Sequence, residues 1–230
     1  MPGAGRAAEG GSAHTEAATV NHGQVHFLID GPPDAPHTLV LAHGAGGAMD
    51  TPFLDTVARG VGERGIRVVR FEFPYMAARR AGGKRGGAPD RQPVLLQAWR
   101  DVVAELGGGP KLVIGGKSLG GRMATMVADE LRVRGVACLG YPFHPPSQPE
   151  RLRTEHLETL RTPALIIQGT RDPFGRSDEV ATYRLSPTIR IEWLADGDHS
   201  FKPRKGSGCT EHEHLVRTVN LLMEFVISIT

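Results

Sequence analysis

The chain has 230 residues, of which 40% are hydrophobic, and its 27 basic and 25 acidic side chains leave a formal net charge of +2. This length and apolar content predict one globular domain with a substantial core, and the near-neutral charge does not favour a nucleic-acid or anionic-membrane partner. The sequence contains no apolar run of bilayer length, and its two cysteines form neither a disulfide framework nor a metal-site spacing. We therefore expect a cytoplasmic protein without a metal or cofactor.

The first residues differ in composition from the rest of the chain. Residues 1–20 are rich in Gly, Ala, Ser and Glu without periodicity, which predicts a mobile tail ahead of one domain at 21–230. Residues 24–30 alternate weakly and suggest a first edge strand. Residues 38–42 are apolar and predict a buried strand that runs into a glycine-rich turn.

A helix and another strand are expected next. Asp50 or Thr51 is suited to cap the helix, with Pro52 in its first turn. Residues 66–73 are apolar enough for the strand. The segment 76–92 is rich in glycine and arginine, which favours a solvated, mobile loop over an anion-binding loop.

The most informative stretch is an apolar run that ends at Ile114 and leads into Gly116-Lys-Ser-Leu-Gly120 and then into a helical pattern. A strand, the pattern G-x-S-x-G and a helix form the context of a nucleophile elbow. The turn pushes its serine toward an unfavourable backbone conformation, and glycine two residues before and after it removes clashing Cβ atoms. Ser118 is therefore a candidate nucleophile at a helix N-terminus. A plain glycine-rich turn with an idle serine is the alternative.

Three further strands and a C-terminal helix are predicted after the elbow. The strands are residues 135–139, 163–168 and 189–194, and the helix carries Leu215, Val219, Leu222 and Val226 on one stripe. Apolar strands that alternate with amphipathic helices predict an α/β fold, a mostly parallel, doubly wound sheet covered on both faces. In such sheets functional residues collect at the carboxyl ends of the strands.

Ser118, Asp172 and His199 each follow a predicted strand, in that order along the chain. A serine hydroxyl needs a base to accept its proton, and an imidazole suits this because its pKa lies near neutral pH. The imidazole in turn needs a carboxylate on its other nitrogen. The sequence therefore predicts Ser118 as nucleophile, His199 as base and Asp172 as the orienting acid.

Other acids and histidines compete for these roles. Asp198 is adjacent to His199 and cannot easily reach its ring, whereas Asp196 is a better rival that follows the same strand as the histidine. His212 and His214 lie two residues apart on a predicted helix, hence on different faces. We expect both to be surface residues rather than a metal pair.

An oxyanion hole needs two fixed N–H donors. We expect one from the amide of Leu119, the residue after the serine, and the other from Ala45 in the turn after strand 38–42. The substrate pocket should be formed by side chains near the same strand ends, namely His43, Gly44, Lys117, Tyr75, Phe143 and His144.

Six segments carry a resemblance to a known family, namely His43–Gly47, Arg70–Tyr75, Gly115–Arg122, Gly140–Pro146, Gln168–Gly175 and Asp198–Phe201. Together they resemble the α/β-hydrolase superfamily, close to its dienelactone-hydrolase-like members. More narrowly, they resemble a bacterial group related to the testis-expressed hydrolase-like protein and to the hydrolase-like subunit of the non-specific-lethal chromatin complex. The resemblance implies the α/β-hydrolase fold with Ser118, Asp172 and His199 as a triad. Dienelactone hydrolase has cysteine where this chain has Ser118, so the resemblance does not bring that substrate.

These observations predict a single-domain, cofactor-free serine hydrolase that cleaves carboxylic esters or thioesters through an acyl-enzyme. The region 141–161 has room for a short helix around 153–160 but not for a lid domain, which predicts an open pocket and a small or exposed acyl group. Two alternatives stay open: an interaction or scaffold module of the same fold, and acyl transfer to an acceptor other than water. The expected partner is a small ester or thioester, with no nucleic acid or membrane, and monomer and homodimer are both compatible with the sequence.

Overall fold

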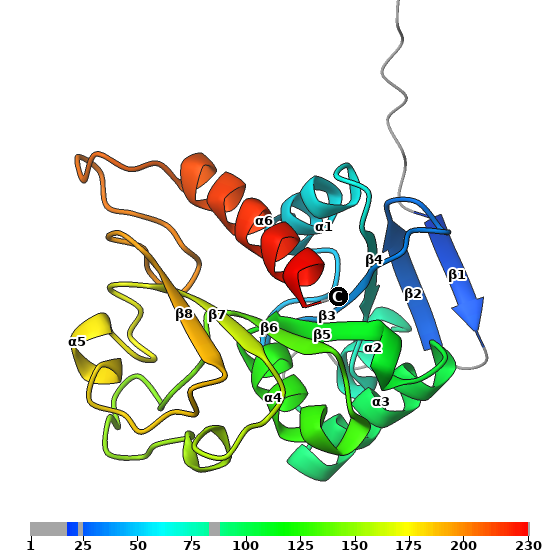
Figure 1. Cartoon of the computed structure of the whole chain (residues 1–230), viewed down its shortest axis with the longest axis horizontal. Helices are drawn as coiled ribbons and strands as arrows, with labels where there is room; N and C mark the ends of the chain where they lie inside the picture. The colour runs from blue at the N-terminus through cyan, green and yellow to red at the C-terminus, as the bar shows by residue number, and fades with distance from the viewer. Residues whose placement is uncertain (1–17, 23–24, 83–87, 230) are drawn as a thin grey trace, which may run out of the picture.

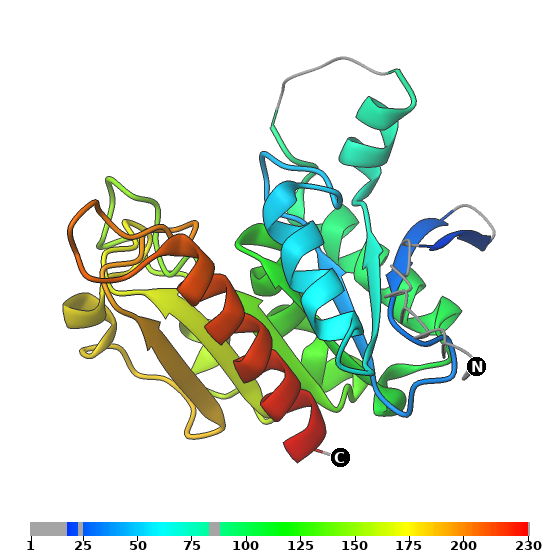
Figure 2. The ribbon, with the colours of Figure 1, turned by 90° about the horizontal axis from the view of Figure 1, so that it is seen from above.

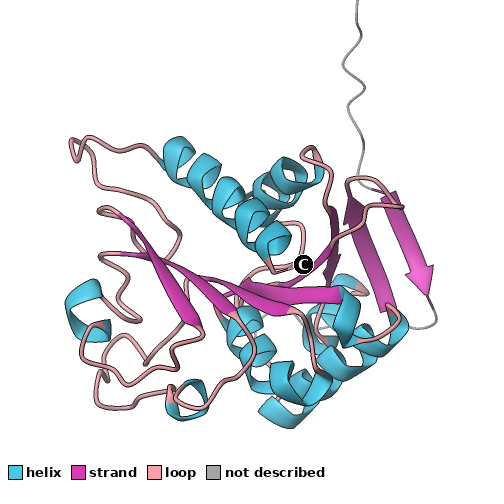
Figure 3. Ribbon diagram, viewed as in Figure 1, coloured by secondary structure: helices cyan, strands magenta, loops and turns pink. Residues whose placement is uncertain are grey.

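A computed structural model describes residues 18–22, 25–82 and 88–229 of the chain. Eight strands form one sheet in the order β1-β2-β4-β3-β5-β6-β7-β8, and β3 to β8 run parallel (Figures 1 and 3). The antiparallel strands β1 and β2 extend the sheet beyond β4. The strands are β1 (Ala18–His22), β2 (Val25–Asp30), β3 (Thr38–Ala42), β4 (Arg67–Phe71), β5 (Leu112–Lys117), β6 (Gly135–Leu139), β7 (Ala164–Gly169) and β8 (Ile189–Leu194). The predicted, mostly parallel sheet is confirmed.

Helices cover both faces of the sheet, as a doubly wound α/β fold requires. Helices α1 (Pro52–Gly62) and α6 (Glu211–Ser228) lie side by side on one face (Figure 2). Helices α3 (Gln92–Glu105) and α4 (Leu119–Leu131) pack together on the other face. The remaining helical segments are short, namely α2 (Pro74–Arg80), α5 (Ser177–Val180) and the 3₁₀ turns η1 (Gly109–Lys111) and η2 (Glu155–Leu157). None of the helices in the described residues is long and apolar enough to cross a membrane.

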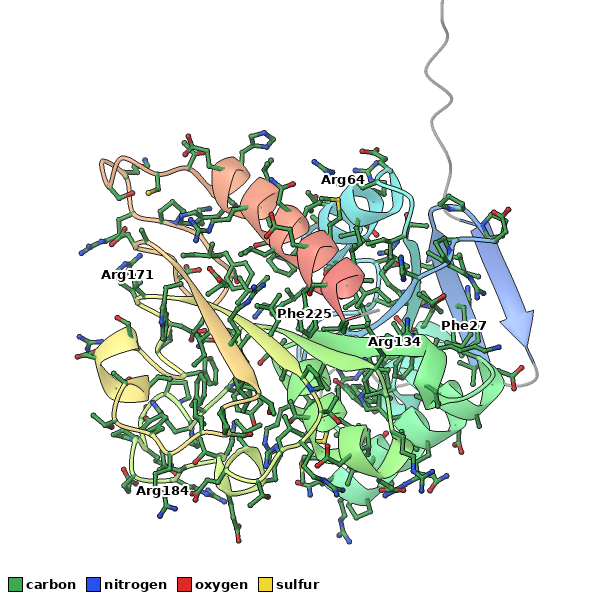
Figure 4. All side chains as sticks on the ribbon, viewed as in Figure 1. Phe27, Arg64, Arg134, Arg171, Arg184 and Phe225 are labelled. Carbon is green, nitrogen blue, oxygen red and sulfur yellow. The ribbon has the colours of Figure 1, made fainter. Side chains whose placement is uncertain are left out.

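The two faces of the sheet bury separate hydrophobic cores. Successive side chains of a strand point to opposite faces, so Leu39 packs in the core under α1 and α6 and Val40 in the core under α3 and α4. On the α3 side the rings of Phe71 and Trp99 meet edge to face at 4.8 Å. On the α6 side Phe225 lies between the helix and the sheet (Figure 4). Burial on both faces explains why the central strands are apolar throughout.

The N-terminal part of the fold differs from the prediction. Strand β1 begins at Ala18, within the segment 1–20 that composition suggested as a tail, whereas residues 1–17 lie outside the described residues. The predicted edge strand at 24–30 exists as β2, but β1 forms the edge. The strand β1 pairs with β2 through a backbone ladder, which residues of any composition can form, so the composition of this segment did not reveal it.

The basic segment 76–92 is not simply a loop. Residues up to Arg80 belong to α2, which begins with Pro74 and buries Tyr75, and residues 83–87 lie outside the described residues. Arg80 donates two hydrogen bonds to the carboxylate of Glu72, at 2.8 and 2.9 Å, which ties the end of α2 back to the strand before it. The expectation of a solvated loop was therefore wrong for residues 76–80. Likewise, the predicted helix at 153–160 is only the single turn η2.

Candidate functional site

The turn between β5 and α4 places Ser118 in a strained conformation, with φ 50° and ψ −109°. Two glycines make this turn possible. A Cβ on Gly116 would stand 2.1 Å from the carbonyl oxygen of Ala42, and one on Gly120 would stand 2.5 Å from the same oxygen. The predicted reason for both glycines is confirmed. The Ser118 side chain does not cap α4, so its hydroxyl is free of a structural role there.

Leu119 and Ala45 place two backbone N–H groups near this serine. Leu119 is the first residue of α4, so its amide has no acceptor within the helix. The positive end of the helix dipole adds to the attraction for an anion at this point. Ala45 lies in the turn 43–51 after β3, which lines the same pocket as Ser118.

Buried side chains fix the beginning of the turn 43–51. The Phe73 amide donates to His43 Nε2 at 3.1 Å, so His43 Nδ1 carries the proton and donates to the Gly44 carbonyl at 2.7 Å. Burial lowers the pKa of His43, which keeps the ring neutral for this role. The Tyr75 hydroxyl contacts the carbonyls of Gly44 and Ala45 at 3.3 and 3.0 Å. Because a trans peptide points its C=O and N–H in opposite directions, the Ala45 N–H points away from His43 and Tyr75.

The far end of the same turn is held by Arg70, which is 1% exposed. Its guanidinium donates to the Met49 carbonyl at 2.8 Å and to Asp30 at 2.9 Å, and it also pairs with Asp55. Arg70 therefore joins β4, β2 and α1 to the turn. In the sequence, Arg70 lies in a family segment, but no role was predicted for it. An arginine inside an apolar strand was the feature that could have indicated a buried ion pair.

Asp172 and His199 form a direct pair at the ends of β7 and β8. His199 Nδ1 lies 2.7 Å from Asp172 Oδ2, and the carboxylate is fully buried while the imidazole is 22% exposed. The Phe174 amide donates to the other oxygen, Oδ1, at 2.9 Å. The Phe174 ring also packs on the imidazole, with 4.3 Å between ring centroids. These contacts orient the ring so that Nε2 is the nitrogen available to a ligand.

Gln168 is a functional neighbour that sequence reasoning missed. Its Nε2 donates to Asp172 Oδ2 at 2.9 Å and to the Tyr141 carbonyl at 3.1 Å, and its Oε1 accepts from the Tyr141 amide at 2.7 Å. Gln168 therefore clamps the carboxylate to the end of β6. The available signal in the sequence was a glutamine at the end of an otherwise apolar strand. The structure buries this amide fully, and a buried amide needs hydrogen-bond partners.

The protonation of His199 reflects this environment. Burial lowers the pKa of His199, the hydrogen bond that its ring donates to Asp172 raises it, and the positive charge of Lys117 lowers it. The overall shift is downward, so the neutral imidazole that a base requires is favoured.

The rival carboxylates are occupied elsewhere. Asp196 pairs with Arg171 and Arg204. Asp198 accepts two backbone N–H groups of its own loop, at 2.8 and 3.0 Å. Of the three carboxylates, only Asp172 is hydrogen-bonded to the His199 ring in the described structure.

An open pocket of about 440 Å³ joins the two halves of the site. Ser118 and His199 both line it, and its wall includes Gly44, Ala45, Phe53, Lys117 and Phe174. The structure thus brings Gly44 and Lys117 to the pocket as the sequence suggested. The aromatic residues Phe53 and Phe174 were not foreseen: Phe53 lies in no motif, and Phe174 lies in a family segment in which only Asp172 was given a role.

Four predicted pocket residues do not line it. His43 and Tyr75 support the turn 43–51 from the core side. Phe143 packs among core aromatic rings, and His144 is buried, with Nδ1 2.8 Å from the Pro145 carbonyl. These residues do lie near the ends of strands, as predicted. Packing, however, sets the direction of each side chain, and none of these four lines the pocket.

His214 is buried rather than exposed, which corrects the expectation for it. Its Nδ1 donates to the Phe201 carbonyl at 2.7 Å and so ties α6 to the loop that carries His199. His214 lies eight residues before Leu222 and shares its inner face of the helix, which makes the buried stripe wider than predicted. His212 is exposed, and no group of three His, Cys, Asp or Glu side chains in residues 18–22, 25–82 and 88–229 could hold a metal ion.

Comparisons with known proteins agree with this architecture. Three solved structures cover 92–94% of this chain and 94–99% of their own. XC6422 from Xanthomonas campestris, described as an α/β serine hydrolase without a lid, shares 22% identity with a TM-score of 0.66. Dienelactone hydrolase from Anabaena variabilis shares 21% (TM-score 0.66), and Est1E from Butyrivibrio proteoclasticus 13% (TM-score 0.69). Residues 35–227 match the family model described as an alpha/beta hydrolase domain. The chain therefore belongs to the α/β-hydrolase family and has its single-domain fold without a lid domain.

Proposed function

We propose that this protein is a serine hydrolase that cleaves carboxylic esters or thioesters of small or exposed acyl groups through an acyl-enzyme. The observation that carries the proposal is the 2.7 Å contact between Asp172 and His199, in a pocket that His199 shares with the strained Ser118. A strained serine beside an oriented imidazole is the arrangement that nucleophilic acyl transfer requires.

In the proposed reaction Ser118 Oγ attacks the carbonyl carbon while His199 Nε2 takes its proton, and Asp172 stabilises the imidazolium. The amides of Leu119 and Ala45 donate to the oxyanion. The C–O or C–S bond then breaks, and His199 returns the proton to the departing alcohol or thiol. Water, deprotonated by His199, releases the acid from Ser118. The described contacts include no hydrogen bond between Ser118 Oγ and His199, and we propose that it forms when substrate binds.

The shape of the pocket supports the proposed substrate class. The connection between β6 and β7 contains only the turn η2 and no inserted domain. The rings of Phe53 and Phe174 offer an apolar wall suited to a short acyl chain. The structural similarity to a dienelactone hydrolase also supports ester chemistry. We include in the proposal the narrower relation to the testis-expressed and chromatin-complex proteins, which rests on the six sequence segments.

The test is turnover of a panel of 4-nitrophenyl esters and acyl thioesters of increasing chain length. We expect hydrolysis of the short members, and a loss of kcat of about 10⁴-fold or more in Ser118→Ala. Ser200→Ala is the matched control, because Ser200 lines the same pocket without a role in the mechanism. Full activity in Ser118→Ala would exclude the mechanism.

The same panel separates the alternatives. A well-folded protein that turns over none of its members would favour the scaffold function. If the acyl group is transferred to added alcohols or amines in preference to water, the protein is an acyltransferase. Cytoplasmic location and the choice between monomer and homodimer stay predictions.

A further inference from the structure

Lys117, the residue before the proposed nucleophile, has a buried amine that the mechanism above does not use. Its Nζ has no hydrogen-bond partner in the part of the chain that the structure describes. The ring of Phe53 lies 5.9 Å from it, and the Gly44 backbone runs beside its stem. An ammonium group buried without a partner is costly, so its presence calls for a specific explanation.

The amine does not face the pocket. Lys117 lines the pocket and is partly exposed there, but its Nζ atom is covered. The pocket is therefore lined by the aliphatic stem, and the charge lies behind it. This arrangement directs the charge toward the protein groups around it rather than toward a bound ligand.

One of these groups is His199, which meets the amine at Gly140. The point where a Cβ on Gly140 would stand lies 3.0 Å from Lys117 Nζ, 3.1 Å from the His199 carbonyl oxygen and 3.3 Å from His199 Cε1. The amine and the ring carbon between the two imidazole nitrogens thus pack on the same glycine. Any larger residue than glycine at position 140 would separate them or displace one.

No acid in the described structure pairs directly with Lys117. Asp172 and Asp198 are the carboxylates that act on its charge, from the loops after β7 and β8. Asp172 is committed to His199 and Gln168, and Asp198 to backbone amides of its own loop. The other groups facing the amine, Phe53 from α1 and the glycines after β3 and β6, carry no charge.

The protonation states agree with this geometry. Burial lowers the pKa of Lys117 to about 8, so most of the amine is still protonated at pH 7. Its charge acts to lower the pKa of His199, in the same direction as burial and against the pull of Asp172.

We propose that Lys117 is a positioning residue whose buried charge, packed with His199 on Gly140, opposes protonation of the imidazole and so extends the working range of the site toward acidic pH. The effect on the pH range of turnover rests on the proposed hydrolase function. The electrostatic coupling between Lys117 and His199 does not depend on that function. The sign is fixed: removing the charge makes the imidazolium easier to form, so His199 is neutral only at higher pH.

The direct test is an NMR titration of the His199 Cε1 proton, with Ser118→Ala as the background so that no turnover is needed. The chain has ten histidines, and the His199 signal is assigned by its loss in His199→Gln. We expect the midpoint to move to higher pH in Lys117→Met and to return toward the original value in Lys117→Arg. The effect should persist in about 0.5 M salt, because the amine is covered and most of the imidazole is buried.

Lys202→Met is the matched control, because Lys202 lies three residues after His199 but is 65% exposed and paired with Glu211. Its His199 midpoint should not move. An unchanged or lowered midpoint in Lys117→Met would overturn the proposal, as would an equal shift in Lys202→Met. Lys117→Gln serves as a second uncharged variant if the methionine variant does not fold.

Kinetics complete the test and separate this inference from the proposed function. In Lys117→Met we expect the ratio of kcat/KM at pH 6 to kcat/KM at pH 8 to fall several-fold, since the base is protonated earlier. Ester hydrolysis with an unmoved His199 midpoint would leave the hydrolase proposal intact and remove the role of Lys117. A moved midpoint without hydrolysis of any ester would do the reverse.

Discussion

The two sides of the pocket are built in different ways. On the Ser118 side the backbone sets the geometry, because glycines at 116 and 120 permit a turn that no other residue could enter without a clash. On the His199 side the geometry depends on side chains, since Asp172 and Gln168 hold the ring through a chain of hydrogen bonds. A backbone turn is part of the fold itself, whereas a side-chain network is added to a fold that exists without it.

This difference predicts that the two sides fail differently. Damage to the side-chain network should remove activity and leave the fold in place. Damage to the turn should remove stability together with activity. Single substitutions on each side test whether the two sides differ in this way.

The largest expected effect is on the His199 side. Asp172→Asn should lower kcat by about 10⁴-fold, because an amide neither stabilises the imidazolium nor selects the productive tautomer. The fold should be kept, with a smaller loss of stability than in the elbow variant below, since asparagine has almost the same shape although its NH2 group faces one of the N–H donors of the network. Steady-state kinetics and thermal unfolding on one preparation give both values.

Asp196→Asn is the control for this prediction, because Asp196 follows the same strand as His199 but pairs with arginines. Its activity should stay within about twofold of the parent, because the two arginines that it pairs with do not hold the His199 ring. A loss in Asp196→Asn equal to that in Asp172→Asn would contradict the assignment of the acid.

The second effect is on the Ser118 side. Gly120→Ala introduces a Cβ 2.5 Å from the Ala42 oxygen and 2.7 Å from the His43 oxygen, both backbone atoms that cannot move freely. We expect the free energy of unfolding to fall by about 3 kcal/mol, with activity lost in parallel. Urea denaturation measures the change.

Gly46→Ala provides the comparison within the turn 43–51, because no atom lies within 4 Å of the added Cβ. Its stability should stay within about 0.5 kcal/mol of the parent. A Gly120→Ala protein as stable as Gly46→Ala would show that the elbow is less constrained than its geometry indicates.

The smallest effect concerns the turn that presents the Ala45 amide. Tyr75→Phe removes the hydroxyl that contacts the Gly44 and Ala45 carbonyls. The hydrogen bonds that hold the turn then lose about 1 kcal/mol of stabilisation. We expect kcat to fall about fivefold with little change in KM, because the oxyanion forms only in the transition state.

Tyr183→Phe is the matched control, since the Tyr183 ring packs on Phe143 away from the turn. It should leave kcat unaltered. An increase in KM for Tyr75→Phe without a decrease in kcat would show instead that the turn contributes to binding of the substrate in its ground state.

The two sides also differ in how far the sequence predicts them. The elbow is encoded in five consecutive residues, so Ser118, its glycines and the start of α4 follow from local pattern. Asp172 and His199 are 27 residues apart, and their pairing was inferred from strand ends and chain order. Gln168 and Arg70 escaped prediction because a buried polar residue acquires its role only from neighbours brought in by the fold.

The errors have a common physical origin. Strand β1 pairs through its backbone, α2 is anchored by the Arg80–Glu72 contact, and His214 turns inward to the Phe201 carbonyl. The contacts of Arg80 and His214 reach partners 8 and 13 residues away, and β1 depends on the strand that follows it. Side-chain direction behind the strand ends, as at Phe143, is likewise decided by packing.

The central claim is that Ser118 is an activated nucleophile. Mass spectrometry after treatment with a fluorophosphonate tests it most directly, with Ser118→Ala in parallel. We predict a single covalent adduct on Ser118 that is absent from the variant. A well-folded protein without an adduct, or with the same adduct in Ser118→Ala, would contradict the account.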